Sequence, residues 1–407
     1  MRDVSIGIDI GTTAVTTAVV ERMADGTIAV RGIGRAPSAG LRRGMIVDVD
    51  ATAQSIRRSV LEASKASGAT IRAAVVGIGG THLGSFTTRG AVAVTRTDGE
   101  ITEQDATRAL AAAEGFISKN PNREIVHVIP REFRVDGQGG VMDPVGLVGM
   151  KLEVEALVID GARPALQNIV KACELAGIEV RDWVANVVAA SSVLLNDQQR
   201  ELGAMLLDLG AGTTDFAIFE EGRLLDAGVI PIGGTHITAD IAIGLRTNIA
   251  AAEQIKLRYA SALPDPRATR RDTIALGDFV RGDSSVFAVR DLVDIIGARL
   301  TDVFELATKA MKRVGRAGLL PGGIVLVGGA ASIPAIQELA RRELRLPVET
   351  ATELSIEGMP LDAPTEFAVS IGLALWEGRG LRFAPRHANR FGSIWEGIKR
   401  VLRTFVP

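Results

Sequence analysis

The sequence is poor in several residues on which whole classes of protein depend. Cys173 is the only cysteine among 407 residues, so the chain cannot form an internal disulfide, and a small buried thiol in a reducing compartment is expected. Aromatic residues make up 4% of the chain and the net charge is −2, which argues against a nucleic-acid-binding protein. The histidines lack the spacing of metal ligands, so core or surface positions are expected for His82, His127, His236 and His387.

Long hydrophobic runs are also missing. No apolar stretch reaches the length of about 20 residues that a membrane-spanning helix requires. The first apolar stretch, residues 4–10, is interrupted by Asp9 and lacks the basic, apolar and cleavage regions of a signal peptide. If the protein meets a membrane, we therefore expect a peripheral contact from the cytoplasmic side.

Glycine, by contrast, is plentiful: 45 of the 407 residues are glycine, which is about 11% of the chain where about 7% is usual. Many turns therefore bring the backbone close to a ligand or to another element. The length of the chain predicts two or more domains of about 100 to 200 residues each.

Two segments share a pattern that is typical of phosphate binding. In each, an apolar strand reaches an aspartate, turns through glycine and threonine, and leaves along a second strand. Glycine lets backbone N–H groups approach phosphate oxygens, threonine hydroxyls add donors, and the aspartate can hold the hydration shell of Mg²⁺. One copy alone could equally be a hairpin turn, but two copies favour a triphosphate site, with Asp208 as the candidate catalytic residue. The first copy contains Asp9, Gly11, Thr12 and Thr13, and the second contains Asp208, Gly210, Ala211, Gly212 and Thr213.

Two further features suit the rest of a nucleotide. A strand at 324–327 ends in small residues whose backbone could lie against an adenine ring, although an ordinary strand-to-helix turn would look the same. Glu253 and Lys256 lie one helical turn apart and could grip ribose hydroxyls, or could form a simple surface ion pair. The small residues after the strand are Gly328, Gly329, Ala330 and Ala331.

The last sixteen residues, 392–407, form an amphipathic helical pattern with a basic rim. Such a helix is marginal in water and is stabilised when its apolar stripe enters a lipid surface. The alternative is a final core helix that packs on the body of the protein. The residues expected to meet the membrane are Ile394, Trp395, Ile398, Lys399, Arg400, Val401, Leu402, Arg403 and Phe405.

The order of elements indicates that the chain begins again halfway. A strand meander and a strand–helix unit are followed by a small α/β insertion, and then the strand–loop–strand pattern returns. Strands are expected at 4–10, 15–20, 28–33, 73–78, 91–95, 125–129, 152–159, 204–209, 215–220 and, as the last one, 324–327. Helices are expected at 51–67, 102–113, 163–176, 185–195, across 235–260, at 292–311 and at 365–376.

This order of motifs resembles the superfamily of actin, Hsp70 and sugar kinases, and within it the bacterial cell-division family FtsA. The resemblance covers essentially the whole chain. It is carried by both phosphate loops, by the sequence from Gly79 to His82 that leads into the insertion, by residues 125–130, by 232–234 with Asp240, and by the C-terminal helix.

The resemblance implies an α/β, actin-like (ribonuclease H-like) duplicated fold with an FtsA-type inserted subdomain and a C-terminal amphipathic helix. It also implies a division of the chain into subdomains. The expected division is 1–84 with 161–200 and 363–376 (1A), 85–160 (1C), 201–240 with 300–362 (2A), 241–299 (2B), a linker at 377–391 and the membrane helix at 392–407.

The cofactors implied by the resemblance are ATP and Mg²⁺, with Asp9 and Asp208 near the metal through water. ATP would contact both phosphate loops, Gly234, the Glu253 and Lys256 pair, and residues 328–331. One position departs from the family pattern, because Asn186 stands where relatives often have an acidic residue. An asparagine cannot act as a general base, so ATP binding is expected together with weak or absent hydrolysis.

The partners implied by the resemblance are the C-terminal peptide of the tubulin-like protein FtsZ, further copies of this chain in filaments, anionic lipid, and later division proteins. The peptide would dock on 241–299, which is suitably basic for an acidic peptide. The expected location is the cytoplasmic face of the cell membrane at the division site. The alternative is a soluble small-molecule kinase of the same superfamily. The basic residues of the docking region are Arg267, Arg270, Arg271 and Arg281.

Overall fold

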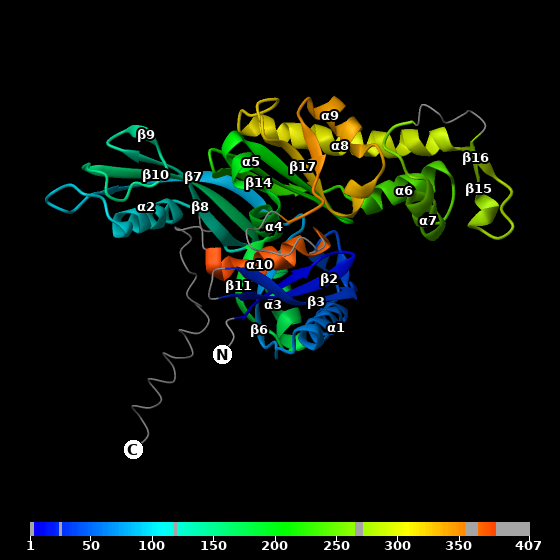
Figure 1. Cartoon of the computed structure of the whole chain (residues 1–407), viewed down its shortest axis with the longest axis horizontal. Coiled ribbons are helices and arrows are strands. Elements are labelled where there is room, and N and C mark those ends of the chain that lie inside the picture. Colours follow the sequence, from blue (N-terminus) through cyan, green and yellow to red (C-terminus); the bar gives the residue numbers. More distant parts are fainter. Residues whose placement is uncertain (1–3, 24–26, 118–119, 265–271, 355–364, 380–407) are drawn as a thin grey trace, which may run out of the picture.

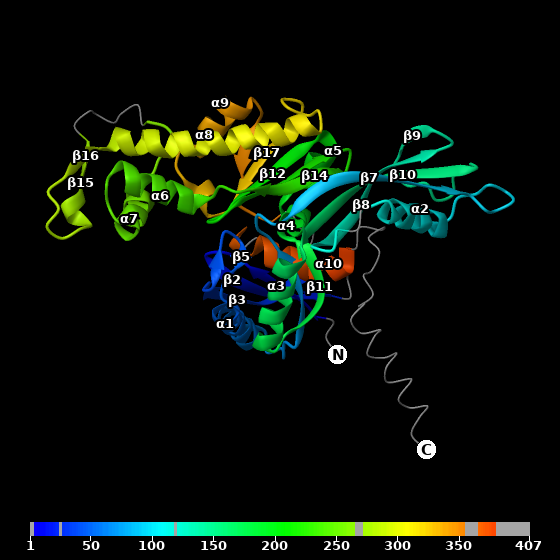
Figure 2. The ribbon, with the colours of Figure 1, turned by 180° about the vertical axis from the view of Figure 1, so that it is seen from behind.

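Two five-stranded sheets with corresponding strand orders form the two halves of the molecule (Figure 1). The computed structural model describes residues 4–23, 27–117, 120–264, 272–354 and 365–379. A four-stranded sheet lies at one end of the molecule, and a small two-stranded hairpin with its neighbouring helix lies at the opposite end (Figures 1 and 2).

The first sheet has the order β11-β6-β1-β2-β3. β1, β2 and β3 form an antiparallel meander, and β6 and β11 run parallel to β1. β6 is buried along its whole length, as expected for a strand covered by helices on both faces. The strands are Val4–Ile10 (β1), Ala14–Arg22 (β2), Ile28–Pro37 (β3), Ala73–Ile78 (β6) and Glu179–Ala185 (β11), with a separate short hairpin of Leu41–Arg42 (β4) and Met45–Ile46 (β5).

The second sheet repeats this arrangement with the order β14-β13-β12-β17-β18. β12, β13 and β14 again form an antiparallel meander, and β17 and β18 again run parallel to β12. The duplicated α/β architecture expected from the sequence is therefore confirmed. The strands are Ala204–Leu209 (β12), Thr214–Glu220 (β13), Arg223–Ile230 (β14), Gly323–Val327 (β17) and Val348–Thr350 (β18).

Helices cover both faces of the first sheet. Val49–Ser67 (α1) and Arg163–Ala176 (α3) lie on its outer face, whereas Asn186–Leu194 (α4) and Ala368–Arg379 (α10) lie on the face toward the second half (Figure 1). α1 begins where the Asp48 side chain accepts a hydrogen bond from the Ala51 amide at 3.0 Å, and it ends at Gly68, whose φ is 69°.

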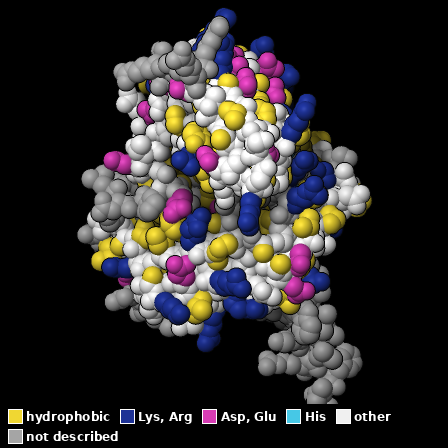
Figure 3. Space-filling view, turned by 90° about the vertical axis from the view of Figure 1, so that its right-hand side faces the viewer, with side chains coloured by type: hydrophobic (Ala, Val, Ile, Leu, Met, Phe, Trp, Pro, Cys, Tyr) yellow, Lys and Arg dark blue, Asp and Glu magenta, His cyan; other side chains and the backbone are white. Residues whose placement is uncertain are grey.

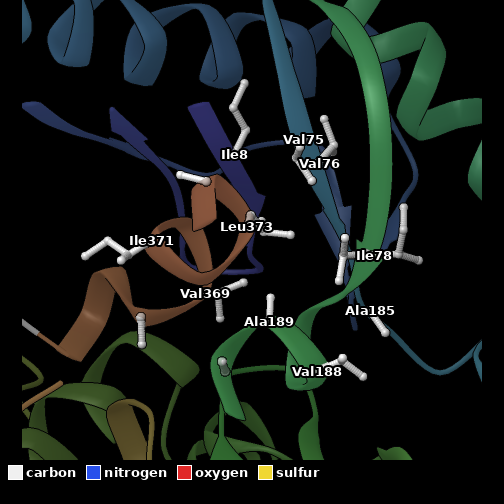
Figure 4. Packing of buried hydrophobic residues seen from close by; sticks show 14 of the residues in the cluster. Ile8, Val75, Val76, Ile78, Ala185, Val188, Ala189, Val369, Ile371 and Leu373 are labelled. Atoms are coloured by element: carbon white, nitrogen blue, oxygen red, sulfur yellow. The ribbon is translucent and has the colours of Figure 1, made fainter. Parts of the chain in front are cut away.

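Two glycines let α10 approach its neighbours at backbone distance. A Cβ atom at Gly7 of β1 would lie 2.0 Å from the carbonyl oxygen of Ser370 in α10. A Cβ atom at Gly372 of α10 would lie 2.1 Å from the carbonyl oxygen of Ala189 in α4. Aliphatic residues such as Ile371 and Leu373 fill the space around these contacts (Figure 4). α10 is therefore seated directly on β1 and α4.

The second half carries further helices, and the expected single helical region at 235–260 is instead two helices. The break lies at 245–248, where Arg246 has a φ of 49° and the Asn248 side chain caps the next helix by accepting from the Ala251 amide. The elements are Asp197–Leu202 (α5), Gly234–Gly244 (α6), Ile249–Tyr259 (α7), Val289–Arg313 (α8), Ile336–Leu344 (α9), the hairpin Thr273–Ala275 (β15) with Val286–Ala288 (β16), and single turns at Leu276–Asp278, Gly329–Ser332 and Thr365–Phe367.

The insertion between β6 and α3 forms the four-stranded sheet, in the order β7-β10-β8-β9. Its helix α2 packs on this sheet and begins at a capping box, in which Thr102 and Asp105 each accept a hydrogen bond from the other's backbone amide. The elements are Gly84–Ala93 (β7), Glu103–Gly115 (α2), Arg123–Val135 (β8), Gln138–Val141 (β9) and Lys151–Ala162 (β10). β8 and β10 are longer than the strands expected at 125–129 and 152–159, and β7 begins before the expected residue 91 and ends at residue 93. β9 was not expected from the sequence.

Three strands that pair in the large sheets were not expected from the sequence. β11 and β14 contain charged residues, and β18 has three residues directly after Pro347, so none shows a clear alternating pattern. Their pairing with β6, β13 and β17 determines their conformation. The last strand expected from the sequence was the one at 324–327, which is β17, but β18 follows it. α10 also extends to Arg379, three residues into the expected linker, whereas residues 380–391 lie outside the described residues.

Candidate nucleotide site

The two phosphate loops face each other between the two halves. A Cβ atom at Gly212 in the second loop would lie 2.9 Å from the Thr12 hydroxyl oxygen of the first. Each loop is closed by a backbone hydrogen bond, from the Gly11 amide to the Ala14 carbonyl at 3.1 Å and from the Gly210 amide to the Asp208 carbonyl at 3.0 Å. Two copies of one motif that lie 199 positions apart in the chain are therefore brought together in space.

Three aspartates gather where β1, β12 and β13 meet. Asp9 pairs with Thr16 across its hairpin, and Asp208 pairs with Asp215 across the corresponding hairpin. Burial raises the pKa of Asp9 to about 7, that of Asp208 to about 6 and that of Asp215 to about 8, and the negative charge of Asp208 adds to the rise at Asp9 and Asp215. Burial and mutual repulsion destabilise the charged forms of these carboxylates, so a nearby cation would stabilise them.

Asp215 was not given a role by the sequence analysis, although it directly follows the second loop. It is buried, and its Oδ1 atom has no hydrogen-bond partner among the described residues. The signal that could have found it is its position on β13, because a residue that pairs with Asp208 across a tight hairpin must share the latter's surroundings.

Asn186, the departure from the family pattern, lies in this cluster at the start of α4. Its Nδ2 atom donates a hydrogen bond to Oδ1 of Asp9 at 3.0 Å, which lowers the pKa of Asp9 and partly opposes the effect of burial. Its Oδ1 atom has no partner within the described part of the chain. The amide is packed against β6 and the following loop, since a Cβ atom at Gly77 or Gly79 would lie within 3 Å of it.

Asn186 and Asp215 line a small pocket together with residues at the root of the insertion and on β14, Gly84 and Gly228 among them. Two partnerless buried oxygens beside a pocket fit a bound water molecule. Among the described residues, no group of three acidic, histidine or cysteine side chains is close enough to bind a metal ion directly. The donor set therefore fits Mg²⁺ held through water by Asp9 and Asp208.

Glu253 and Lys256 lie beside the second loop. Lys256 Nζ forms an ion pair with Glu253 at 2.7 Å and donates hydrogen bonds to the Thr238 hydroxyl at 2.8 Å and the Gly234 carbonyl at 3.2 Å. The Gly234 amide donates in turn to the Gly210 carbonyl at 2.9 Å. The pair is thus connected to the phosphate loop through α6, and the 42% exposed Glu253 side chain remains open to a ligand.

The small residues after β17 lie beside the second loop. Gly328 has a φ of 89°, which favours glycine, and a Cβ atom there would lie 2.4 Å from Oδ1 of Asp208. The backbone then forms a single turn in which Ala331 is buried, Ala330 is half-buried, and a Cβ atom at Gly329 would meet only open space. This segment offers exposed backbone next to the second loop.

Other predicted residues have structural places or fall outside the described residues. The Nε2 atom of His127 accepts a hydrogen bond from the Ala185 amide at 3.0 Å, and Nδ1 of His236 accepts one from the Gly233 amide at 3.1 Å. Cys173 is buried, and burial raises its thiol pKa to about 12. Residues 392–407, Arg267, Arg270 and Arg271 lie outside the described residues, and within those that are described no helix could cross a membrane.

Comparison with protein families gives two matches. The family described as "Cell division protein FtsA" matches residues 205–372, and "SHS2 domain inserted in FTSA" matches residues 80–160, which coincide with the insertion. The cell division protein FtsA of Pseudomonas aeruginosa is 37% identical over 354 residues, covering 87% of this chain and 84% of its own. FtsA of Borreliella burgdorferi is 31% identical over 400 residues, covering 98% of this chain and 95% of its own.

Solved structures show the same fold at low identity. A chain of the PilM-PilN type IV pilus biogenesis complex superposes with a TM-score of 0.65 at 19% identity, covering 92% of this chain and 98% of its own. MreB5 of Spiroplasma citri bound to ADP superposes with a TM-score of 0.55 at 16% identity, covering 93% of this chain and 97% of its own. The fold is thus shared with actin-like proteins, as the sequence predicted, and the relatives favour cell division over a soluble kinase.

Proposed function

The chain belongs to the FtsA family of cell-division proteins, and from this premise we propose that it binds ATP between its two halves, assembles into filaments, and tethers FtsZ to the cytoplasmic face of the membrane. The observation that carries the proposal is the pair of facing phosphate loops around three buried aspartates. A fold neighbour that is described as bound to ADP supports it.

Different residues between the two halves would bind different parts of the nucleotide. Backbone amides at 12–13 and 211–213 would donate to phosphate oxygens, since those of Gly11 and Gly210 already donate within their loops, and the Glu253 carboxylate would accept from ribose hydroxyls. Asp9 and Asp208 orient water around Mg²⁺, which when bound neutralises charge on the phosphates. The segment 328–331 supplies backbone for the adenine ring.

Hydrolysis is expected to be slow in this site. Asn186 occupies the start of α4 beside Asp9 and cannot take a proton from water. Asp215 is an alternative base, but burial raises its pKa to about 8 without a bound cation, which disfavours the charged form that a base requires. We therefore propose that bound ATP controls assembly rather than serving as fuel for rapid turnover.

Asp208→Ala tests the nucleotide site. We expect the affinity for Mg²⁺-ATP to fall by at least about tenfold, because a charge-assisted contact of roughly 1.5 to 3 kcal/mol is lost. The measurement is isothermal titration calorimetry of the full chain, with Asp302→Ala in exposed α8 as a control that also removes one carboxylate. Equal affinity in the Asp208 variant and the control would show that the loop assignment is wrong.

The proposed membrane contact is the helix at 392–407, which follows α10 after a segment of twelve residues, 380–391. One such helix should bind lipid reversibly, because it offers a net two positive charges besides its apolar stripe. Many copies along a filament would bind together far more strongly through effective concentration. The FtsZ peptide is proposed to dock on 241–299, where Arg281 is exposed.

Electron microscopy on lipid monolayers tests this function as a whole. We expect filaments of the full chain to cover the lipid only when ATP is present, and deletion of 392–407 to abolish the lipid-bound filaments. A variant with Glu396→Gln is the control, since it keeps the apolar stripe. Lipid-bound filaments that persist after the deletion would contradict the membrane role of this segment.

A further inference from the structure

We infer that the outer face of the first half, formed by α1 and α3, is a second lipid-binding surface that holds the body of the protein against anionic headgroups. The inference rests on the proposed membrane tethering and adds a contact that the C-terminal helix does not supply. We define the α1–α3 face by six exposed residues: Arg58, Leu61, Lys65, Arg72, Lys171 and Leu175.

The cations of this face lack acidic partners. Arg58, Lys65, Arg72 and Lys171 form no ion pair with any described residue. In the insertion, by contrast, every described Lys or Arg from 85 to 163 pairs with an Asp or Glu, as Arg123 does with Asp160 and Arg131 with Glu155. The positive charge of the α1–α3 face is therefore free to meet phosphate groups, whereas that of the insertion is already neutralised.

Few carboxylates oppose these cations. Glu62 and Glu174 are exposed on α1 and α3, and Glu179 is exposed beside Arg72, to whose carbonyl its amide donates; Glu62 already accepts a hydrogen bond from the Arg35 amide at 2.7 Å. Figure 3 shows several Lys and Arg side chains at the lower end of the molecule, where α1 lies in Figure 1, among hydrophobic side chains and some Asp and Glu. A net positive surface on a chain whose overall charge is −2 indicates charge that is placed locally.

Two exposed leucines stand among the cations. Leu61 is 54% exposed on α1 and Leu175 is 44% exposed on α3. The Arg57 guanidinium donates to the Leu175 carbonyl and so joins the two helices side by side. Leu61 follows Arg57 by one helical turn, and Leu175 follows Lys171 by one turn. A surface of unpaired cations around protruding leucines matches the headgroup region of an anionic bilayer better than an acidic protein, which would leave the leucines without a partner.

The position of the face allows it to act together with the C-terminal helix. α10 and α1 lie on opposite faces of one sheet, and the layers from α10 to the outer surface of α1 are on the order of 25 Å thick, given the usual dimensions of helices and sheets. The twelve residues 380–391 can span up to about 40 Å. The C-terminal helix can therefore reach a membrane on which the α1–α3 face rests.

The test is co-sedimentation of the full chain with vesicles, using Arg58→Glu together with Lys65→Glu. The control is Lys309→Glu with Lys312→Glu, which makes the same charge change on exposed α8 at the opposite end of the molecule. Vesicles of phosphatidylcholine alone and of phosphatidylcholine mixed with phosphatidylglycerol distinguish charge from general apolar binding. Thermal unfolding of each variant establishes that it is folded.

On anionic vesicles we expect the face variant to bind at least about tenfold more weakly than the control, a difference that shrinks with added salt and vanishes on neutral vesicles. Equal binding of the two variants to anionic vesicles would overturn the inference, as would an equal loss on neutral vesicles. If inorganic phosphate released the protein from the vesicles at constant ionic strength, the α1–α3 face would be a site for free phosphate, and the inference would be overturned. Deletion of 392–407 distinguishes this inference from the proposed tethering. If the deleted chain binds vesicles as well as the full chain, the proposed tethering is wrong. If the deletion abolishes binding but the face variant binds as well as its control, only this inference is wrong.

Discussion

β1 and β12 hold equivalent places in two sheets of corresponding strand order, yet they differ two residues before the loop aspartate. β1 has Gly7 there, and β12 has Leu206, which is fully buried. Gly7 lets the backbone of α10 lie directly on the first sheet, whereas Leu206 fills the corresponding space with a side chain. The comparison teaches that a duplicated fold can keep its loop geometry while one residue decides how closely a helix may approach.

Exchanging these residues should have the largest effect. In Gly7→Leu the new side chain would overlap Ser370 and Leu373, so we expect loss of more than about 4 kcal/mol of unfolding free energy and largely insoluble protein. Urea unfolding of the soluble fraction and the yield of folded protein are the measurements. Gly115→Ala at the end of α2, where a Cβ atom meets nothing within 4 Å, is the control and should be close to neutral. Normal stability in Gly7→Leu would mean that α10 is not seated as described.

The edge strands of the two sheets give a second contrast. Asp226 on β14, the edge of the second sheet, accepts from the Ser85 hydroxyl of the insertion at 2.9 Å and from Arg313 Nε at 2.8 Å, whereas β3, the edge of the first sheet, is covered by α1. Asp226 is buried, so Asp226→Ala removes the charge-assisted hydrogen bonds that it accepts from Ser85 and Arg313 and should cost about 3 kcal/mol in urea unfolding. Asp294→Ala removes the exposed pair with Arg290 and should cost less than about 1 kcal/mol. Equal costs would show that Asp226 does not join the insertion to the second half.

The aspartates of the two loops predict a pH dependence, which should be smaller still. Their pKa values lie above the usual 3.8 in the folded chain, so the folded state holds protons more tightly than the unfolded state between about pH 4 and pH 8. Without nucleotide, stability should therefore fall as the pH rises through this window. Asp215→Asn removes the group with the highest of these pKa values. It should reduce the fall in unfolding free energy between pH 5.5 and pH 8 by on the order of 2 kcal/mol. Urea unfolding at the two pH values measures this, and an unchanged pH dependence of the unfolding free energy would mean that Asp215 is ionised in the folded protein.

The sequence was most informative where local chemistry and periodicity agree. Residues 163–176 form α3 as expected, and both phosphate loops follow their strands at the expected residues. The helix expected at 102–113 is α2, and Thr102 and Asp105 at its start form a capping box. These features depend on neighbours in the chain, and such neighbours interact in nearly any fold.

The sequence was least informative where distant segments determine the outcome. The charged strand β11 forms because β6 lies beside it, and the role of Asp215 depends on its distance from Asp9 and Asn186, which come from other elements. The unpaired state of Lys65 likewise could not be read from its neighbours in the chain, because partners of an exposed cation are chosen by the packing of helices.

The amino-acid sequence by itself determined the duplicated strand–loop–strand units and the family, because glycine, threonine and aspartate at fixed spacing can make few other turns. Only the tertiary structure decided that the two loops face each other, that Asn186 bonds to Asp9, and that α10 rests on Gly7. The physical reason is distance: desolvation, charge coupling and close backbone contact act between groups a few ångströms apart in space, wherever they stand along the chain.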